Sequence, residues 1–239
     1  MRNAILDPSK KNSWKMFNRI AGTYDSVNRL ISFGLDIGWR KKVNSLLPKK
    51  EQLRILDLAT GTADQIILLC SINPKITTAV GMDLSEGMLE KGREKLKEKS
   101  LSQRIHLQQG DAVQIPSEND CYDAVTISFG IRNVPDVLAS MKEMHRVLEK
   151  GGKALILEFS LPKNPFVRWG HLFYLRYVLP FVGGILSGDY EAYRYLNTTI
   201  EDFPYGESFA AILHNAGFEK VNLHPVSFGI ATIYEAIKE

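Results

Sequence analysis

A short run of small residues between two acids is the first place where this chain could do chemistry. Residues 57–64 read Asp-Leu-Ala-Thr-Gly-Thr-Ala-Asp and follow an apolar run that is typical of a buried strand. Small side chains there let a ligand approach the backbone, and the amides of the next helix start would face an anionic group. About twenty residues later a second apolar run ends at Asp83, where a carboxylate is placed to bind a ribose diol.

The glycine content of this loop separates two classes of cofactor. Gly61 is the only glycine within residues 57–64, whereas a G-x-G-x-x-G loop gives a dinucleotide pyrophosphate close access to the backbone. S-adenosylmethionine carries no phosphate, and it needs room for a sulfonium, a carboxylate and an ammonium group beside a ribose anchor. The loop and Asp83 therefore favour S-adenosylmethionine over NAD.

Two further segments follow the ends of predicted strands, where ligands bind in parallel sheets. Asp111 is placed to accept a hydrogen bond from an adenine amino group, and Ala112 to supply a backbone amide. The alternative for Asp111 is the capping of a turn. Ser128 and Phe129 follow the fourth apolar run and are expected to line the pocket of the methyl donor.

The elements that must position these residues alternate between short β-rich runs and helical patterns, which predicts an α/β fold. Helix 134–149 is predicted with Pro135 in its first turn and Gly151-Gly152 as a stop. The last two strands are close in sequence and predict a hairpin. The expected architecture is a Rossmann-like, seven-stranded, mostly parallel sheet with a final antiparallel strand and helices on both faces. The predicted strands are 54–58, 78–83, 105–109, 122–128, 153–159, 218–223 and 230–237, and the other predicted helices are 63–71, 86–99 and 208–216.

Two regions lie outside this alternation. Residues 1–50 have a helical pattern with aromatic and basic residues, and we expect them to fold over the cofactor as a lid. Residues 160–205 are rich in aromatics, glycine and proline, and we expect an apolar cover inserted into a domain that spans 51–239. Within the cover, 166–186 predicts a large apolar surface, whose alternative is completion of the core or of a subunit interface.

Composition excludes several classes of protein. The 239 residues are 44% hydrophobic and 24% charged, which predicts a globular chain of one domain or one and a half. Thirty Lys and Arg against 27 Asp and Glu give a net charge of +3, too weak to predict nucleic-acid binding. Cys70 and Cys121 form no metal-ligand spacing, so we expect no metal. The polar start, residues 1–13, carries no secretion signal and predicts a cytoplasmic protein.

Five segments together resemble the motifs of class I S-adenosylmethionine-dependent methyltransferases: 55–64, 81–88, 110–116, 126–134 and 146–152. With them, Tyr24-Asp25, 32–34, 128–133, 158–160 and 189–196 resemble the ubiquinone/menaquinone biosynthesis C-methyltransferase family over nearly the whole chain. The resemblance implies S-adenosylmethionine as cofactor and C-methylation of a polyprenyl quinol, with demethylmenaquinol to menaquinol as the expected reaction.

The resemblance also carries residue roles over to this chain. It implies cofactor contacts at the loop, beside Gly61, and at the ends of the next strands: Thr62, Asp83, Asp111, Ala112 and Ser128. Where the family has glycines, this chain has Thr60 and Ala63, and we expect a narrower cofactor pocket.

Three residues are candidates for the chemistry of the acceptor. A quinol carbon becomes nucleophilic when its hydroxyl loses a proton, and a cation stabilises the phenolate. Arg132 is the candidate cation, and its alternative role is to bond loop carbonyls. Tyr24 and Asp25, in the lid, are further catalytic candidates, and the alternative for Tyr24 is packing of the lid.

The implied partner is a lipid, the polyprenyl quinol. The apolar cover further predicts peripheral contact with the inner membrane, and a homodimer is a second expected association. Three other functions stay open. One is methylation of another hydrophobic acceptor, such as a sterol or a phospholipid. The second is an NAD-dependent oxidoreductase, which would need a richer glycine fingerprint. The third is a binding module without activity.

Overall fold

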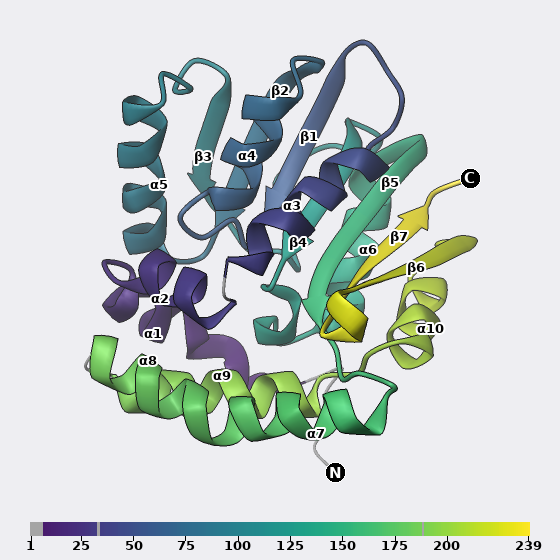
Figure 1. Cartoon of the computed structure of the whole chain (residues 1–239). Coiled ribbons are helices and arrows are strands. Elements are labelled where there is room, and N and C mark those ends of the chain that lie inside the picture. Colours follow the sequence, from purple (N-terminus) through teal and green to yellow (C-terminus); the bar gives the residue numbers. More distant parts are fainter. Residues whose placement is uncertain (1–6, 33, 188) are drawn as a thin grey trace.

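Seven strands form one sheet in the order β3-β2-β1-β4-β5-β7-β6 in the computed structural model, which describes residues 7–32, 34–187 and 189–239 (Figure 1). The first five strands pair in parallel, and β7 is antiparallel to both of its neighbours. The predicted Rossmann-like sheet is therefore confirmed. The strands are β1 (Leu53–Leu58), β2 (Ile76–Asp83), β3 (Ile105–Gln109), β4 (Tyr122–Ser128), β5 (Leu148–Phe159), β6 (Lys220–Val226) and β7 (Ala231–Ile237).

The final strand lies inside the sheet rather than at its edge. β7 pairs with β5 on one side and with β6 on the other, so the predicted hairpin is present and β6 forms the edge. The sequences explain this order. β7 is buried along almost its whole length, whereas β6 is half-buried and contains Pro225, which cannot donate a ladder hydrogen bond and suits an edge.

Helices cover both faces of the sheet, and each face has its own apolar core. α5 shows how such a helix is specified: Leu89 and Leu96 lie seven residues apart on one buried stripe, and Ser85 caps the start by accepting from the Met88 amide. One face carries α3 (Leu35–Leu46), α4 (Asp64–Ile72) and α5 (Glu86–Glu98), and the other carries α6 (Val137–Val147) and α10 (Glu207–Asn215).

The prediction for helix 134–149 is wrong at both ends. α6 begins at Val137, because Asp136 is the N-cap and its Oδ1 accepts from the Ala139 amide at 2.9 Å, so Pro135 lies before the cap. Leu148 already belongs to β5, where it pairs with Tyr122 of β4. The diglycine after it therefore lies within a long strand and does not stop the helix.

A layer of helices lies across the carboxyl ends of the strands, at the bottom of Figure 1. Its two parts share a third core that joins Ile20 of α1 to Leu175, Leu179 and Leu196 of the cover. Residues 160–205 thus contribute helices to this layer. The N-terminal part is η1 (Pro8–Asn12), α1 (Ser13–Ile20) and α2 (Tyr24–Ile31), and the cover is α7 (Pro165–Phe173), the π-helical η3 (Tyr174–Val178), α8 (Leu179–Ser187) and α9 (Tyr190–Asp202).

Two short 3-10 turns follow strand ends: η2 (Ile131–Asn133) lies between β4 and α6, and η4 (Ser227–Gly229) joins β6 to β7. In the described part of the chain, no helix combines the length and the apolar character needed to cross a membrane.

Candidate functional site

The loop after β1 is held in a shape that the neighbouring strand end stabilises. Ala59, Gly61 and Ala63 have φ values of 46°, 56° and 68°, in the left-handed region. The Gly61 amide donates to Asp83 Oδ2 at 2.8 Å, so the acid at the end of β2 anchors the loop. The Thr60 hydroxyl donates to Asp57 Oδ2 at 2.6 Å. The Thr60 hydroxyl therefore turns toward Asp57 of β1, and the expected narrowing of the cofactor pocket stays a prediction.

A pocket of about 90 Å³, which we call the strand-end pocket, lies where these strand ends meet the N-terminal helices. Five of the six predicted cofactor residues line it: Gly61, Asp83, Asp111, Ala112 and Ser128. The other walls include residues of η1, α1 and α2 and apolar residues of the loops and of α5: Lys10, Ser13, Trp14, Phe17, Tyr24, Leu84, Met88, Phe129 and Val134. The structure thus brings together residues that are far apart in the sequence.

The acids of the strand-end pocket fit a nucleoside. Asp83 Oδ1 accepts from the Ser85 amide at 2.8 Å, and the Gly61 and Leu84 amides also bond the carboxylate, whose remaining lone-pair capacity can serve a ligand hydroxyl. Burial raises the pKa of Asp83, although backbone hydrogen bonds to the carboxylate oppose that shift. Asp111 Oδ1 accepts from the Val113 amide at 3.1 Å. One oxygen of Asp111 therefore caps a turn, as the alternative interpretation held.

Thr62 and Asp25 meet in a second, smaller pocket of about 30 Å³, which we call the polar pocket. The Thr62 hydroxyl donates to Asp25 Oδ1 at 2.5 Å, and Lys95 Nζ bonds Thr62 at 2.9 Å and Asp64 at 2.7 Å. Lys95 also forms an ion pair with Asp25. Burial opposes ionisation of Asp64, but Lys95 holds its pKa below the usual value.

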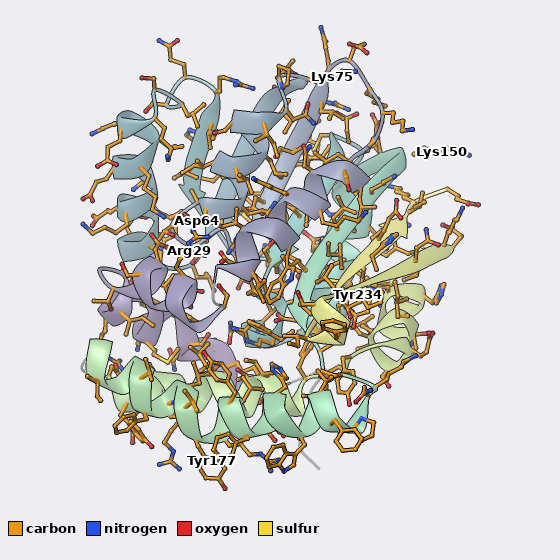
Figure 2. All side chains as sticks on the ribbon, viewed as in Figure 1. Arg29, Asp64, Lys75, Lys150, Tyr177 and Tyr234 are labelled. Atoms are coloured by element: carbon orange, nitrogen blue, oxygen red, sulfur yellow. The ribbon has the colours of Figure 1, made fainter. Side chains whose placement is uncertain are left out.

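This cluster ties α2 to α4 and α5. Arg29 of α2 adds a contact to Asp64 at 3.4 Å, and the two labelled side chains lie side by side in Figure 2. Asp25, predicted as a catalytic candidate, therefore fixes the lid region against the loop that follows β1.

Arg40 of α3 lines the polar pocket and was missed by the sequence reasoning. Its NH1 lies 3.4 Å from Gln65 Oε1, its Nε lies 3.6 Å from Asp36 Oδ2, and its Cζ lies 5.4 Å from the Phe129 ring. Within the described residues the buried Nε makes no hydrogen bond. Since no motif in the sequence includes Arg40, only the packing of α3 reveals this cation.

A larger cavity of about 360 Å³, which we call the cover cavity, lies between the strand ends and the cover. Its polar groups come from Tyr24, Asn28, Arg132 and His171, among others, and most of its wall is apolar. The apolar residues include Leu35, Trp39, Phe129, Phe159, Val167, Leu175, Leu179, Leu196, Ile200 and Ile230.

Arg132 is buried at the wall of the cover cavity. Its NH1 donates to Phe129 O at 2.7 Å and to Glu158 Oε1 at 2.6 Å. Its Cζ lies 5.5 Å from the Phe159 ring. Arg132 therefore bonds a loop carbonyl, as the structural alternative expected, and it also lines a cavity, as a candidate cation for the acceptor must. Glu158 lies in the segment 158–160 that resembles the family but was given no role, although a carboxylate in the apolar run of β5 is the signal that could have assigned one.

Tyr24 lines all three pockets, and Phe129 lines both the strand-end pocket and the cover cavity. Burial raises the pKa of Tyr24 above its ordinary value, while Arg132 opposes this shift. The phenol therefore stays neutral near pH 7 and can donate a hydrogen bond. Tyr24 also packs edge-to-face on Phe17 of α1, with ring centroids 6.0 Å apart, so it takes part in packing of the lid region as well.

The outer side of the cover carries an exposed stripe, which we call the aromatic stripe: Phe166, Trp169, Phe173, Tyr177, Phe181 and Ile185. Tyr177 points away from the body of the protein in Figure 2. In an α-helix, residues four positions apart differ by about 40° in direction around the helix axis, so a stripe at this spacing would gradually turn away from one face. The π-helical turn of η3 has more residues per turn, which offsets this rotation and keeps the stripe on one face.

The other side of the same helices, with Leu175 and Leu179, faces the cover cavity. The surface predicted over 166–186 thus divides into an exposed and a buried face; the side chain of Leu186 lies outside the described residues, as does Phe33 of the motif 32–34. Among the residues that the structure describes, no group of three or more His, Cys, Asp or Glu is arranged to hold a metal ion.

Comparisons with known proteins agree with this geometry. The ubiE/COQ5 methyltransferase family matches residues 7–238. The chain is 40% identical to "Ubiquinone/menaquinone biosynthesis C-methyltransferase UbiE" of Geotalea daltonii, over 94% of this chain and 95% of that protein. It is also 40% identical to "Demethylmenaquinone methyltransferase" of Bacteroides fragilis, over 94% and 91%.

Solved structures share the fold at low sequence identity. A "SAM-dependent methyltransferase, possible histamine N-methyltransferase" of Thermotoga maritima superposes with a TM-score of 0.66 at 18% identity, over 95% of this chain and 99% of that one. The "[4+2]-Cyclase SpnF" gives 0.70 at 14% identity, over 98% and 97%. At such identities the likeness establishes the fold alone.

Proposed function

The chain belongs to the ubiE/COQ5 methyltransferase family, and from this premise we propose that it methylates a ring carbon of a polyprenyl quinol, converting demethylmenaquinol to menaquinol. Its methyl donor is S-adenosylmethionine. The observation that carries the proposal is a pair of adjoining sites. A pocket lined by strand-end acids and a largely apolar cavity share Tyr24 and Phe129 in their walls.

The strand-end pocket and the polar pocket would hold the cofactor. Asp83 would accept both ribose hydroxyls, and Asp111 with Ala112 would bind the adenine edge, between the apolar walls. Arg40 would pair with the carboxylate of the methionine end, because it is a cation in the wall of the polar pocket. Gly61 and Ser128 line both pockets and would lie along the ligand between its two ends.

S-adenosylmethionine supplies a strongly electrophilic methyl group on a sulfonium, so the protein's task is mainly alignment. Thr62 and Asp25 contribute by tying α2 to the loop after β1, through Lys95. Residues of η1, α1 and α2 would then act as a lid that excludes water from the site.

The acceptor ring would lie in the cover cavity. Arg132 lines this cavity with a guanidinium that stabilises negative charge on the quinol oxygen as the hydroxyl ionises. Tyr24 would donate a hydrogen bond at the boundary between the two sites, since its phenol stays protonated. The apolar walls suit the ring and the first part of a polyprenyl tail.

The aromatic stripe gives the lipid a route to the cavity. Six large side chains on one exposed helix face suit the interface of a bilayer, and the opposite face of that helix lines the cover cavity. Peripheral contact with the inner membrane is therefore part of the proposal. A homodimer formed through the stripe is the alternative association.

The deciding experiment is methyl transfer from labelled S-adenosylmethionine to demethylmenaquinone, with and without a reductant. We expect transfer only to the reduced quinol, because the oxidised quinone has no hydroxyl to ionise and its ring carbon is electron-poor. Equal rates on both forms would contradict the phenolate mechanism. Phosphatidylethanolamine and a sterol serve as comparison acceptors, and faster methylation of either would replace the proposed substrate.

A further inference from the structure

The ion pair between Arg132 and Glu158 is unusual because it is both buried and incomplete. Arg132 is 3% exposed and Glu158 is 1% exposed. The two side chains share one hydrogen bond, from NH1 to Oε1 at 2.6 Å, and the Arg132 backbone amide also bonds the Glu158 carboxylate. Among the described residues, Arg132 Nε and Glu158 Oε2 are both buried and have no hydrogen-bond partner. A pair that served stability alone would gain from a closed, two-bond arrangement, so the open one points to another role.

Within the residues that the structure describes, only one nitrogen of the Arg132 guanidinium, NH1, is held by hydrogen bonds, and it makes two of them: one to Glu158 Oε1 and a second to a backbone carbonyl. NH1 also donates to Phe129 O at 2.7 Å. Glu158 Oε1 in turn accepts from the Phe159 amide at 2.8 Å. Glu158 belongs to β5, which is paired on both sides by β4 and β7, so its carboxylate is attached to an interior strand of the sheet.

The two members of the pair differ in their access to the acceptor. Arg132 lines the cover cavity, whereas Glu158 is not among the described residues that line any of the three pockets. Glu158 can therefore act on an acceptor only through Arg132. The Phe159 ring, 5.5 Å from the guanidinium carbon, limits the tilt of the guanidinium plane.

We propose that Glu158 is a positioning residue for the methylation: it fixes NH1 of Arg132, so that the remaining guanidinium donors stay free for the ionising hydroxyl of the acceptor. The inference rests on the proposed function, because it requires an acceptor oxygen in the cover cavity. Fixing one nitrogen of a planar fork orients the other two, and a mobile guanidinium would have to be ordered again in each turnover.

Glu158→Gln tests the proposal, since glutamine keeps the shape and removes the charge. We expect kcat to fall about 10- to 100-fold, as when a residue that orients a catalytic group is replaced. The Kd for S-adenosylmethionine and the KM for the quinol should change little, because Glu158 touches neither ligand. A folded Glu158→Gln enzyme with wild-type kcat would overturn the proposal.

A double-mutant cycle separates a role through Arg132 from an independent one. Arg132→Lys keeps the charge but loses the planar fork, so there is little left for Glu158 to orient. We therefore expect Glu158→Gln to add almost no further loss of kcat in the Arg132→Lys enzyme. Losses that multiply would show that Glu158 acts independently, which overturns the assignment.

Asp123→Asn is the matched control for loss of a buried carboxylate. Asp123 pairs with Lys50 and Arg54 outside the three pockets as the described residues define them, so its substitution should lower thermal stability and leave kcat unchanged.

If Glu158→Gln does not fold, Glu158→Asp carries the test. The aspartate side chain is one methylene shorter, so its carboxylate keeps the charge but no longer reaches NH1 of Arg132. We therefore expect kcat to fall, and an unchanged kcat overturns the proposal. If the proposed function is wrong, the wild-type enzyme does not methylate the reduced quinol. If only the role of Glu158 is wrong, the wild type is active and the Glu158 variants keep its kcat.

Discussion

Tyr24 of α2 and Phe129, directly after β4, lie together in the wall between the strand-end pocket and the cover cavity. Phe129 has a φ of 60°, a conformation that costs a non-glycine residue about 1–2 kcal/mol. Its ring packs 4.7 Å from that of Phe159, which helps to hold it there. Strain of this kind collects at ligand sites, and here it directs an aromatic ring to the boundary between the two pockets.

Tyr24→Phe should separate the hydroxyl of Tyr24 from its ring. Because the ring still closes the wall, we expect the Kd for S-adenosylmethionine to stay near its wild-type value. Loss of the hydrogen bond to the acceptor should lower kcat by about 10- to 100-fold, the effect of about 1.5–3 kcal/mol in a bond to a charged group. Single-turnover methyl transfer and calorimetric titration measure the two quantities. An unchanged kcat would leave Tyr24 with a packing role alone.

Asp83→Asn should weaken cofactor binding: its amide oxygen can still accept from the Gly61 amide, but its NH2 group then faces the Ser85 amide that the carboxylate now bonds. Charge-assisted bonds to two ribose hydroxyls would be lost, and we expect the binding free energy to fall by about 2–3 kcal/mol. Isothermal titration with S-adenosylmethionine measures the change. Glu94→Gln, on the exposed side of α5, is the control, and equal Kd values for the two variants would remove Asp83 from the site.

Arg132→Lys should affect the chemical step far more than cofactor binding. A point charge cannot reproduce the planar fork, and removal of one electrostatic group of this kind costs about 10²–10³ in kcat. The measurement is kcat on the reduced quinol beside the Kd for S-adenosylmethionine. Arg54→Lys, whose side chain pairs with Asp123 and Glu149, controls for the loss of an arginine ion pair. Comparable losses of kcat in both variants would return Arg132 to a structural role.

Trp169→Ser combined with Phe173→Ser should reduce binding to vesicles of phosphatidylglycerol and phosphatidylethanolamine. Each large apolar side chain contributes about 1.5–3 kcal/mol when it leaves water, so we expect at least a tenfold drop in partitioning, as measured by sedimentation. Activity on a short-chain, water-soluble quinol should persist. Ile72→Ser, exposed on α4, is the control. Unchanged vesicle binding together with loss of a dimer in solution would assign the stripe to self-association.

Asp57 should make stability depend on pH. Burial raises its pKa to about 6, against an ordinary value of 3.8, although bonds from Thr126 and Thr60 favour the ionised form. The folded protein thus holds this proton more tightly than the unfolded chain. Its stabilising contribution is complete below about pH 4 and is lost as the pH rises through about 6, by up to about 3 kcal/mol.

Denaturant unfolding of the wild type and of Asp57→Asn between pH 4 and pH 7 measures this contribution. The unfolding free energy of the wild type relative to Asp57→Asn should fall by up to about 3 kcal/mol between about pH 4 and pH 6, and it should stay constant at higher pH. A difference that does not vary with pH would show that Asp57 ionises normally in the folded state.

The sequence by itself determined the sheet and indicated five candidate cofactor residues that the structure brings into one pocket. Apolar runs of strand length and the small residues after β1 are local signals, and an acid such as Asp83 at a strand end must lie at the carboxyl edge of a parallel sheet. The ends of α6 and β5 were beyond that reasoning. Leu148 continues a helical pattern in the sequence, but pairing with Tyr122 makes it strand, since tertiary contacts override local preference.

Only the tertiary structure decided which polar side chains meet. Arg132 and Glu158 are 26 residues apart, and Thr62 and Asp25 are 37 residues apart, yet each pair shares a hydrogen bond. Arg40 reaches the polar pocket because α3 packs across the sheet. Such contacts depend on the relative placement of separate helices and strands, which follows from side-chain packing in three dimensions and has no local period. For that reason the sequence indicated which strand ends carry candidate ligand residues, and the fold decided which polar side chains contact one another.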